Sequence, residues 1–224
     1  GHDAFLLEPE VLTRLISGFL LNVHDPGEAT QSGGDQAYIQ QPSVESIFSG
    51  RRVDYELIET LIEPESSVLD IGCGDGGLLH RLIARKNVRG MGVELNQNSV
   101  CRCVERGINV IQSDVDHGLG GFGDGSFDYV ILSQTLQTIR RPDRVIREML
   151  RVGRKGIVSF PNFAHWRARL QIALHGATPI TGYLPFQWYD SPNIRLATIR
   201  DFEKFCDRMG FEIIKEVPLV HYSA

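Results

Sequence analysis

The chain has 224 residues, of which 42% are hydrophobic and 23% are charged, and its formal net charge is −5. This composition is ordinary for a globular protein, and the length suits one good-sized core with an appendage. The sequence contains no apolar run of the length that a membrane helix needs, and its acidic balance disfavours a protein that binds duplex nucleic acid. We therefore expect a cytoplasmic protein with neither a membrane nor a nucleic-acid partner.

The four cysteines are Cys73, Cys101, Cys103 and Cys206, and none of them forms a C-x-x-C pair. Cys101 and Cys103 lie two residues apart in an expected helix, so they point to different faces and are poorly placed to share a metal ion. We expect reduced thiols and no metal site.

The first 50 residues differ in character from the rest. Residues 9–22 place apolar side chains on one helical face, and residues 24–43 are polar and rich in turn formers. We expect residues 1–50 to be an N-terminal extension, an amphipathic helix followed by a polar loop, and residues 51–224 to form the main domain. The helix either covers an open edge of that domain or docks on a partner.

From residue 51 onward, helices and strands alternate along the chain. We expect strands at 66–72, 89–95, 108–114, 127–136, 155–162 and 211–219, and helices at 51–63, 77–86, 96–107, 141–153, 163–176 and 198–210. This alternation predicts right-handed βαβ units in an α/β fold of the Rossmann-like kind, with a mostly parallel sheet and helices on both faces. Ligands of such sheets bind beyond the carboxyl ends of the strands.

The first strong functional signal is the loop Gly-Cys-Gly-Asp-Gly-Gly at 72–77, between an expected strand and an expected helix. Gly72, Gly74 and Gly77 have the G-x-G-x-x-G spacing of a dinucleotide site. Glycines there allow tight backbone geometry and a close approach of a ligand. The glycine pattern alone leaves two ligands open, a dinucleotide and an adenosyl compound.

Acidic residues at the ends of three expected strands favour the adenosyl compound. Asp70 precedes the glycine loop, where its negative charge would repel a pyrophosphate but attract a free amino group. Glu94 comes 20 residues after Gly74, a spacing that suits an acid bound to ribose hydroxyls. Asp114 can accept a hydrogen bond from an adenine amino group. S-adenosyl-L-methionine (SAM) carries a ribose diol, an adenine and an ammonium, but no phosphate, so it matches these acids better than NAD does.

The segments "VLDIGCGDG", "GVEL" and "SD" resemble the motif series of class I SAM-dependent methyltransferases. Longer segments, including "SFPNFAHWRARL" and "LPFQWYDSPNIRLATIRDFEKFC", resemble the MetW family of methionine-biosynthesis proteins. The resemblance covers about residues 51–217 and implies the class I methyltransferase fold. It implies a protein that binds SAM or S-adenosylhomocysteine (SAH) and acts with a homoserine O-acyltransferase. The alternative is a methyltransferase with an unidentified small-molecule acceptor.

The resemblance also implies roles for individual residues. Asp70 and the loop of Gly72, Cys73 and Gly74 would hold the methionine end of the cofactor. Glu94, with Leu95 after it, would bind the ribose, and Asp114 with Val115 would contact the adenine. Ser133 and Gln134, which follow the fourth expected strand, would lie beside the ligand. No residue is assigned a catalytic role.

Three positions depart from the family pattern: Asn96 stands in place of an acid, Ala164 in place of a glycine, and Arg195 in place of a histidine. The N-terminal extension is not part of the usual pattern. The fold normally ends in two strands, but only 211–219 reads as one, so either the last strand is absent from this chain or the sheet has six strands.

Two further features have alternative interpretations. The residues that are candidates to face a methyl acceptor are His165, Trp166, Tyr183, Trp188, Tyr189 and Asp190. Of these, His165 is either a general base or a structural residue.

A basic cluster on and around the helix at 141–153 comprises Arg140, Arg141, Arg144, Arg147, Arg151, Arg154 and Lys155. It is either a solvated outer face or a surface for an acidic partner.

Overall fold

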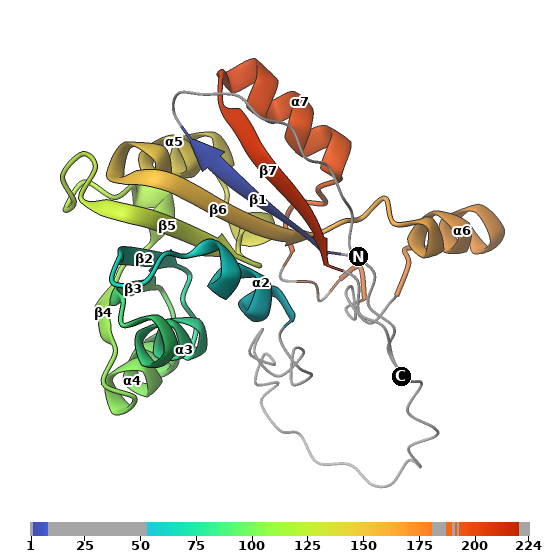
Figure 1. Cartoon of the computed structure of the whole chain (residues 1–224). Helices are drawn as coiled ribbons and strands as arrows, with labels where there is room; N and C mark the ends of the chain where they lie inside the picture. The colour runs from blue at the N-terminus through green and yellow to red at the C-terminus, as the bar shows by residue number, and fades with distance from the viewer. Residues whose placement is uncertain (1, 9–52, 181–186, 190, 192, 220–224) are drawn as a thin grey trace, which may run out of the picture.

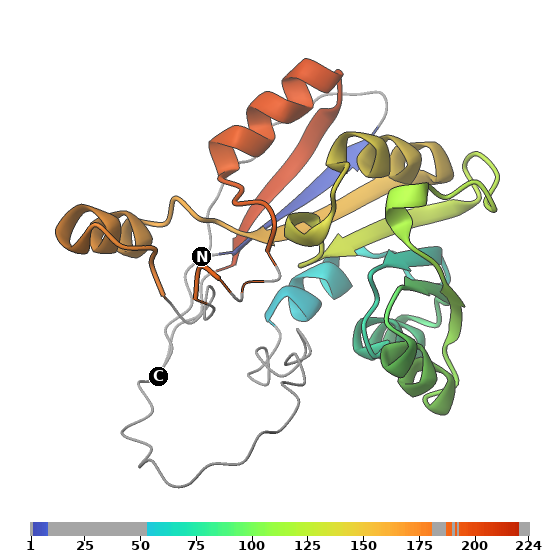
Figure 2. The same ribbon diagram turned by 180° about the vertical axis from the view of Figure 1, so that it is seen from behind.

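The computed structural model describes residues 2–8, 53–180, 187–189, 191 and 193–219, so the helix expected at 9–22 and the loop expected at 24–43 lie outside the described residues. The described chain forms a sheet with helices on both faces (Figures 1 and 2). The strands are β1 His2–Glu8, β2 Ser67–Ile71, β3 Arg89–Glu94, β4 Asn109–Gln112, β5 Phe127–Ser133, β6 Gly153–Pro161 and β7 Glu212–Leu219. The helices are α2 Val53–Leu61, α3 Gly77–Lys86, α4 Gln97–Glu105, α5 Pro142–Val152, α6 Trp166–His175 and α7 Ile199–Met209, with short 3-10 helices η1 Val115–His117 and η2 Leu136–Thr138.

The strand order is β4-β3-β2-β5-β6-β1-β7, and the strands from β4 to β6 pair in parallel. The chain proceeds from β2 outward to β4 on one side and from β5 to β6 on the other. The point where the direction reverses therefore lies between β2 and β5, and ligands of open α/β sheets bind at such a point. This architecture confirms the predicted Rossmann-like fold.

Strand β1 occupies a place in the sheet that the sequence did not indicate. It pairs antiparallel with both β6 and β7, so that His2 lies opposite Pro161 on one side and Leu219 on the other. The expected alternative of a six-stranded sheet is wrong, because residues from the expected extension supply a seventh strand among the described residues.

Each face of the sheet carries its own hydrophobic core. On one face α5 and α7 pack on side chains such as Leu69 and Val130, and on the other α2, α3 and α4 pack on side chains such as Val68 and Ile131. Successive strand residues point to opposite faces, which accounts for this division. Asp70 follows Leu69 and therefore lies on the face that α2 covers.

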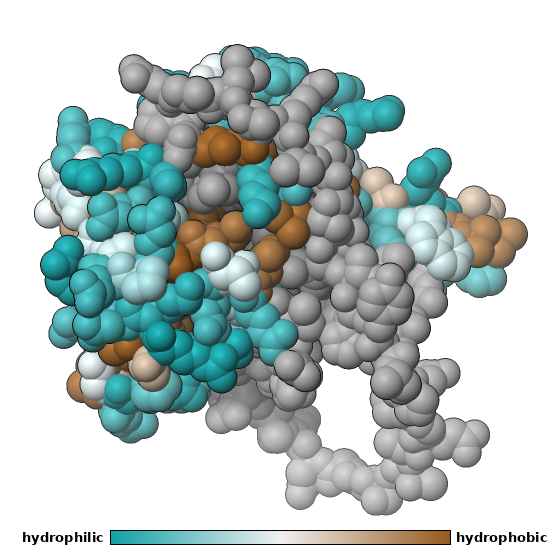
Figure 3. All heavy atoms as spheres, in the orientation of Figure 1, coloured by the Kyte–Doolittle hydropathy of each residue, from teal (hydrophilic) through white to brown (hydrophobic). Residues whose placement is uncertain are grey.

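Helix α6 extends away from the sheet (Figures 1 and 2). Its side chains Leu170 and Leu174 are exposed, and Figure 3 shows hydrophobic residues at the outer end of this helix. Among the described helices, none is both long enough and apolar enough to cross a membrane.

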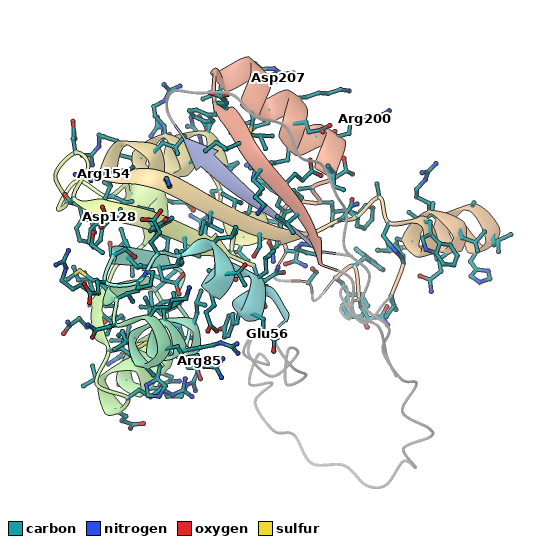
Figure 4. The ribbon with its side chains drawn as sticks, viewed as in Figure 1. Glu56, Arg85, Asp128, Arg154, Arg200 and Asp207 are labelled. Atoms are coloured by element: carbon teal, nitrogen blue, oxygen red, sulfur yellow. The ribbon has the colours of Figure 1, made fainter. Side chains whose placement is uncertain are left out.

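Asp128, near the start of β5, is hydrogen-bonded to the start of the neighbouring strand β2. Its Oδ2 accepts hydrogen bonds from Ser67 N at 2.9 Å and Ser67 Oγ at 2.7 Å, and Arg154 lies 3.4 Å from Oδ1 (Figure 4). These donors hold the pKa of the Asp128 carboxyl below its ordinary value. A lowered pKa contributes stability that is present above the ordinary value and is lost as the pH falls through the folded value.

We expect Asp128→Asn to lower the free energy of unfolding by about 1 kcal/mol at pH 7, after allowance for its partial exposure. The difference from the unmodified chain should shrink as the pH falls from 5 toward 2 (roughly the carboxylate titration range), as measured by urea unfolding. The exposed Asp207 on α7 provides the matched control, since Asp207→Asn should show no comparable difference at any pH (Figure 4). A loss for Asp128→Asn that is independent of pH would contradict this assignment.

Candidate functional site

The glycine loop lies at the carboxyl end of β2 and is held against the end of β3. Gly72 N and Cys73 N donate to Val93 O at 2.7 and 3.2 Å, and Gly74 N donates to Glu94 Oε2 at 2.9 Å. Gly72 has a φ of +70°, and a Cβ at this position would lie 2.6 Å from the Thr135 side chain. Only glycine combines this backbone with such close packing, so the loop has the tight geometry that the sequence predicted.

The end of β3 connects the glycine loop to the next helix. While Glu94 Oε2 accepts from the loop, its Oε1 accepts from Asn96 N at 2.8 Å. The Asn96 side chain in turn caps α4, because its Oδ1 accepts from Asn98 N at 2.9 Å and Ser99 N at 3.2 Å. This capping gives a structural role to a residue that departs from the family pattern. Glu94 is thereby oriented at the carboxyl edge of the sheet.

The other two strand-end acids occupy the same edge of the sheet. Asp70 is 2% exposed and lies in β2 beside Gly92 of β3 and Ile131 of β5. Asp114 follows β4, and its Oδ1 caps the short helix η1 by accepting from Asp116 N at 2.9 Å. The structure thus places all three acids at the ends of three adjacent parallel strands, as the sequence predicted. Their roles toward a ligand stay predictions.

The hydrophobic residues predicted beside these acids differ in exposure. Val115 begins η1 and packs against the core that α5 and α7 cover. Leu95 follows β3 and is 61% exposed. Cys73 is buried, its Sγ lies 3.9 Å from Cys103 Sγ, and burial raises the pKa of its thiol. The Cys73 side chain therefore packs in the core, and within the glycine loop Cys73 offers its backbone.

A hydrogen-bonded network supports the residues after β5. Gln134 has a φ of +53°, which is uncommon for a residue with a side chain, and is 7% exposed. Gln134 N donates to Ser159 O at 2.9 Å, and Gln134 Nε2 donates to Ser159 Oγ at 3.2 Å. Ser159 Oγ also donates to Ser133 Oγ at 3.3 Å. Strained, well-supported residues are typical of ligand sites, so this network favours a functional role for the loop.

Asp54 belongs to the same network, although sequence reasoning missed it. It lies in the first turn of α2, is 6% exposed, and its Oδ2 accepts from Ser133 Oγ at 2.8 Å. The sequence around it predicts an amphipathic helix, and a polar residue near the start of such a helix ordinarily faces solvent. Its contact with Ser133, which is far away in the sequence, places Asp54 beside the carboxyl end of β5.

The predicted acceptor side lies beyond β6. A cavity of about 320 Å³ is lined by residues of η2, α7 and 194–197, and a second of about 240 Å³ is lined by Phe163, Thr178, Trp188 and neighbours. Ile194 and Leu196 border both cavities. His165 is buried, whereas Trp188 and Tyr189 are 77% and 70% exposed, and Tyr183 and Asp190 lie outside the described residues. These cavities have room for a small apolar molecule, and the described residues around them do not identify a general base.

The basic cluster is largely engaged with its own neighbours. Arg151 pairs with Glu148 at 2.7 Å and Asp124 at 2.6 Å, and Arg141 pairs with Asp143 at 2.9 Å. Arg147 lies over the ring of Phe211, and Lys155 lies over the ring of Tyr129. These intramolecular partners favour the interpretation of the basic cluster as a solvated outer face.

All four cysteines are free, and Cys101 is exposed while Cys103 is buried, as their spacing predicted.

A family profile and a related sequence both identify the same family for this chain. A family profile described as "Methionine biosynthesis protein MetW" matches residues 52–224. The chain is 38% identical to the bifunctional methionine biosynthesis protein MetXA/MetW of Rhodopirellula baltica, over 97% of this chain and 34% of that protein. It is 28% identical to norajmaline N-methyltransferase of Rauvolfia serpentina, over 66% of this chain and 53% of that enzyme. The chain thus spans about a third and about half of these two relatives.

Solved structures support the fold. A SAM-dependent methyltransferase of Thermotoga maritima, described as a possible histamine N-methyltransferase, superposes with a TM-score of 0.52 and 20% identity, over 71% of each chain. Phosphoethanolamine N-methyltransferase 2 of Haemonchus contortus, in complex with SAM, gives a TM-score of 0.54 and 19% identity, over 70% of this chain and 36% of that one. At these identities the likeness shows the architecture alone.

Proposed function

The chain belongs to the MetW family of methionine biosynthesis proteins, and from that premise we propose that it binds SAM and regulates or supports a homoserine O-acyltransferase. The observation that carries the SAM assignment is the hydrogen bond from Gly74 N to Glu94 Oε2, at 2.9 Å. It brings Glu94, the acid proposed to bind the ribose, to the glycine loop, which follows β2 beside the point where the sheet reverses direction. The methyltransferase fold of the solved neighbours supports the same ligand.

The residues present fit this cofactor. Gly72 lets the loop backbone pack directly against the Thr135 side chain, which an added Cβ would meet at 2.6 Å. The neighbouring acids suit a ligand with hydroxyls and a cationic amine but no phosphate. Asp70 would attract the ammonium, Glu94 would accept from the ribose hydroxyls, and Asp114 would accept from the adenine amino group. The bound cofactor supplies an electrophilic methyl group if methyl transfer occurs.

A fused relative supports the partner. The Rhodopirellula baltica protein joins MetXA and MetW in one chain, and two activities in one chain remain at high effective concentration. The match to the Rhodopirellula baltica protein covers all but about seven (3%) of the 224 residues. It therefore includes most of residues 1–51, which lie outside the range that the family profile matches. We propose that residues 9–51, which follow strand β1 in the chain, provide the contact with the acyltransferase. The free cysteines support a reducing compartment such as the cytoplasm.

The experiment that tests the partner role uses the full chain and the homoserine O-acyltransferase of its host. We expect the two proteins to co-elute in size-exclusion chromatography and the acylation rate to change when the chain is added. Glu94→Gln should keep the complex but lose any dependence of that rate on SAM. Separate elution together with an unchanged rate would contradict the partner role.

The second candidate function is methyl transfer to a small molecule. The two adjoining cavities bordered by Ile194 and Leu196, together with the plant N-methyltransferase relative, favour it. Transfer of a labelled methyl group from SAM to a metabolite, without any acyltransferase present, would support this function over the first.

A further inference from the structure

The first turn of α2 lies over the point where the sheet reverses direction. In Figure 1, α2 lies at the edge of the sheet where β2 and β5 end. Asp54 of this turn accepts from Ser133, the last residue of β5, and Tyr55 lies beside Gly77 of the glycine loop, where an added Cβ would be 3.6 Å from the Tyr55 ring. The turn therefore contacts both segments that border the predicted methionine end of the cofactor.

Strand register places Asp54 on the same face as Asp70. Asp70 pairs with Ile131, and Ser133 lies two residues further along β5, so Ser133 points to the same face one step beyond the end of β2. Ile131 belongs to the core that α2 covers, which identifies that face. The carboxylate of Asp54 thus lies beyond Asp70, over the junction of β2 and β5, and 6% exposed.

SAM and SAH differ in charge at one atom. Both carry an ammonium and a carboxylate, but SAM also carries a positive sulfonium where SAH has a neutral thioether. A carboxylate with little solvent around it interacts more strongly with a nearby cation than an exposed one does. A negative side chain over the methionine end would therefore stabilise SAM more than SAH.

We propose that Asp54 is a further residue of the cofactor site and that its charge selects the sulfonium of SAM over the thioether of SAH. This inference rests on the proposed binding of SAM. The hydrogen bond from Ser133 orients the carboxylate, and the contacts of Ser133 with Ser159 and of Ser159 with Gln134 hold that donor in place. Such selectivity would let the protein respond to the methylated form of the cofactor.

The test compares the dissociation constants of SAM and SAH, measured by calorimetry on the full chain. We expect Asp54→Asn to weaken SAM binding at least about tenfold and SAH binding less than about threefold. Retained SAH binding also shows that the variant is folded. Asp54→Glu keeps the charge and should keep most of the preference, and Asp207→Asn on α7 removes the same charge far from α2 and should change neither constant (Figure 4).

Equal losses for the two ligands in Asp54→Asn would show that Asp54 only anchors α2, and unchanged dissociation constants for both ligands would show that its charge does not act on the cofactor. Either result overturns the inference while the binding of SAM stands. Failure of the unmodified chain to bind either ligand would instead remove the cofactor assignment, and the inference with it.

Discussion

Glu94→Ala is expected to abolish measurable binding of SAM and SAH, which we expect the unmodified chain to bind with micromolar dissociation constants. Each hydrogen bond to a charged acceptor contributes about 1.5–3 kcal/mol, so the loss of two ribose contacts corresponds to at least about a hundredfold weaker binding. Isothermal titration calorimetry measures this directly. Asp70→Ala should show a similar loss, because it removes the partner of the ammonium.

The alanine variant also removes the acceptor of Gly74 N and Asn96 N, so a second substitution separates binding from loop structure. Glu94→Gln keeps one carbonyl oxygen and the shape of the side chain but loses the charge. Glutamine keeps only one of the two acceptors, so we expect Glu94→Gln to lose less stability than Glu94→Ala and still to bind SAM and SAH at least about tenfold more weakly than the unmodified chain. Unaltered affinity in Glu94→Gln would contradict the ribose assignment, and tight binding of NAD would contradict the choice of an adenosyl ligand.

Gly72→Ala is expected to have the second large effect, on stability as well as on binding. An alanine there takes on a φ of +70°, and its Cβ meets the Thr135 side chain at 2.6 Å. The left-handed backbone costs about 1–2 kcal/mol and the overpacking about 1–3 kcal/mol. A loss of about 2–5 kcal/mol corresponds to a melting temperature lower by roughly 5–15 °C for a chain of this size. Differential scanning calorimetry measures it.

Gly107 provides the matched control for this substitution. It has a φ of +72°, but no atom of any residue beyond its two chain neighbours lies within 4 Å of the position that a Cβ would occupy. Gly107→Ala should therefore lose stability only through the backbone conformation, and the difference between the two variants isolates the contact with Thr135. Adding Thr135→Ala to Gly72→Ala should recover part of that difference. Equal losses in the two single variants would show that the contact is unimportant.

The part of the fold that follows local periodicity could be predicted from the sequence. The helix expected at 77–86 is α3, and the strand expected at 89–95 is β3 with one residue fewer. Glu94 and Asp114 could be predicted as neighbours because the carboxyl ends of adjacent parallel strands meet at one edge of a sheet. These inferences need only the alternation of strands and helices, which the hydrophobic pattern encodes.

The remaining features depend on contacts between residues far apart in the chain. Strand β1 pairs with residues at least 149 positions away, and no periodicity in seven residues specifies such a partner. Asp54 meets Ser133 across 79 positions, so its burial follows from how α2 packs on the sheet and not from its helix. The capping role of Asn96 is predictable from its neighbourhood, since asparagine is a preferred N-cap, whereas the family pattern indicates only that an acid is missing at this position.

A crystal structure of the chain with SAH tests the central claim most directly. We predict the amino-acid end of the ligand at Asp70 and the 72–74 loop, the ribose hydroxyls on Glu94, and the adenine beside Asp114 and Val115. An adenosyl ligand bound elsewhere, or an edge where the three carboxylates turn away from a common crevice, would contradict the account.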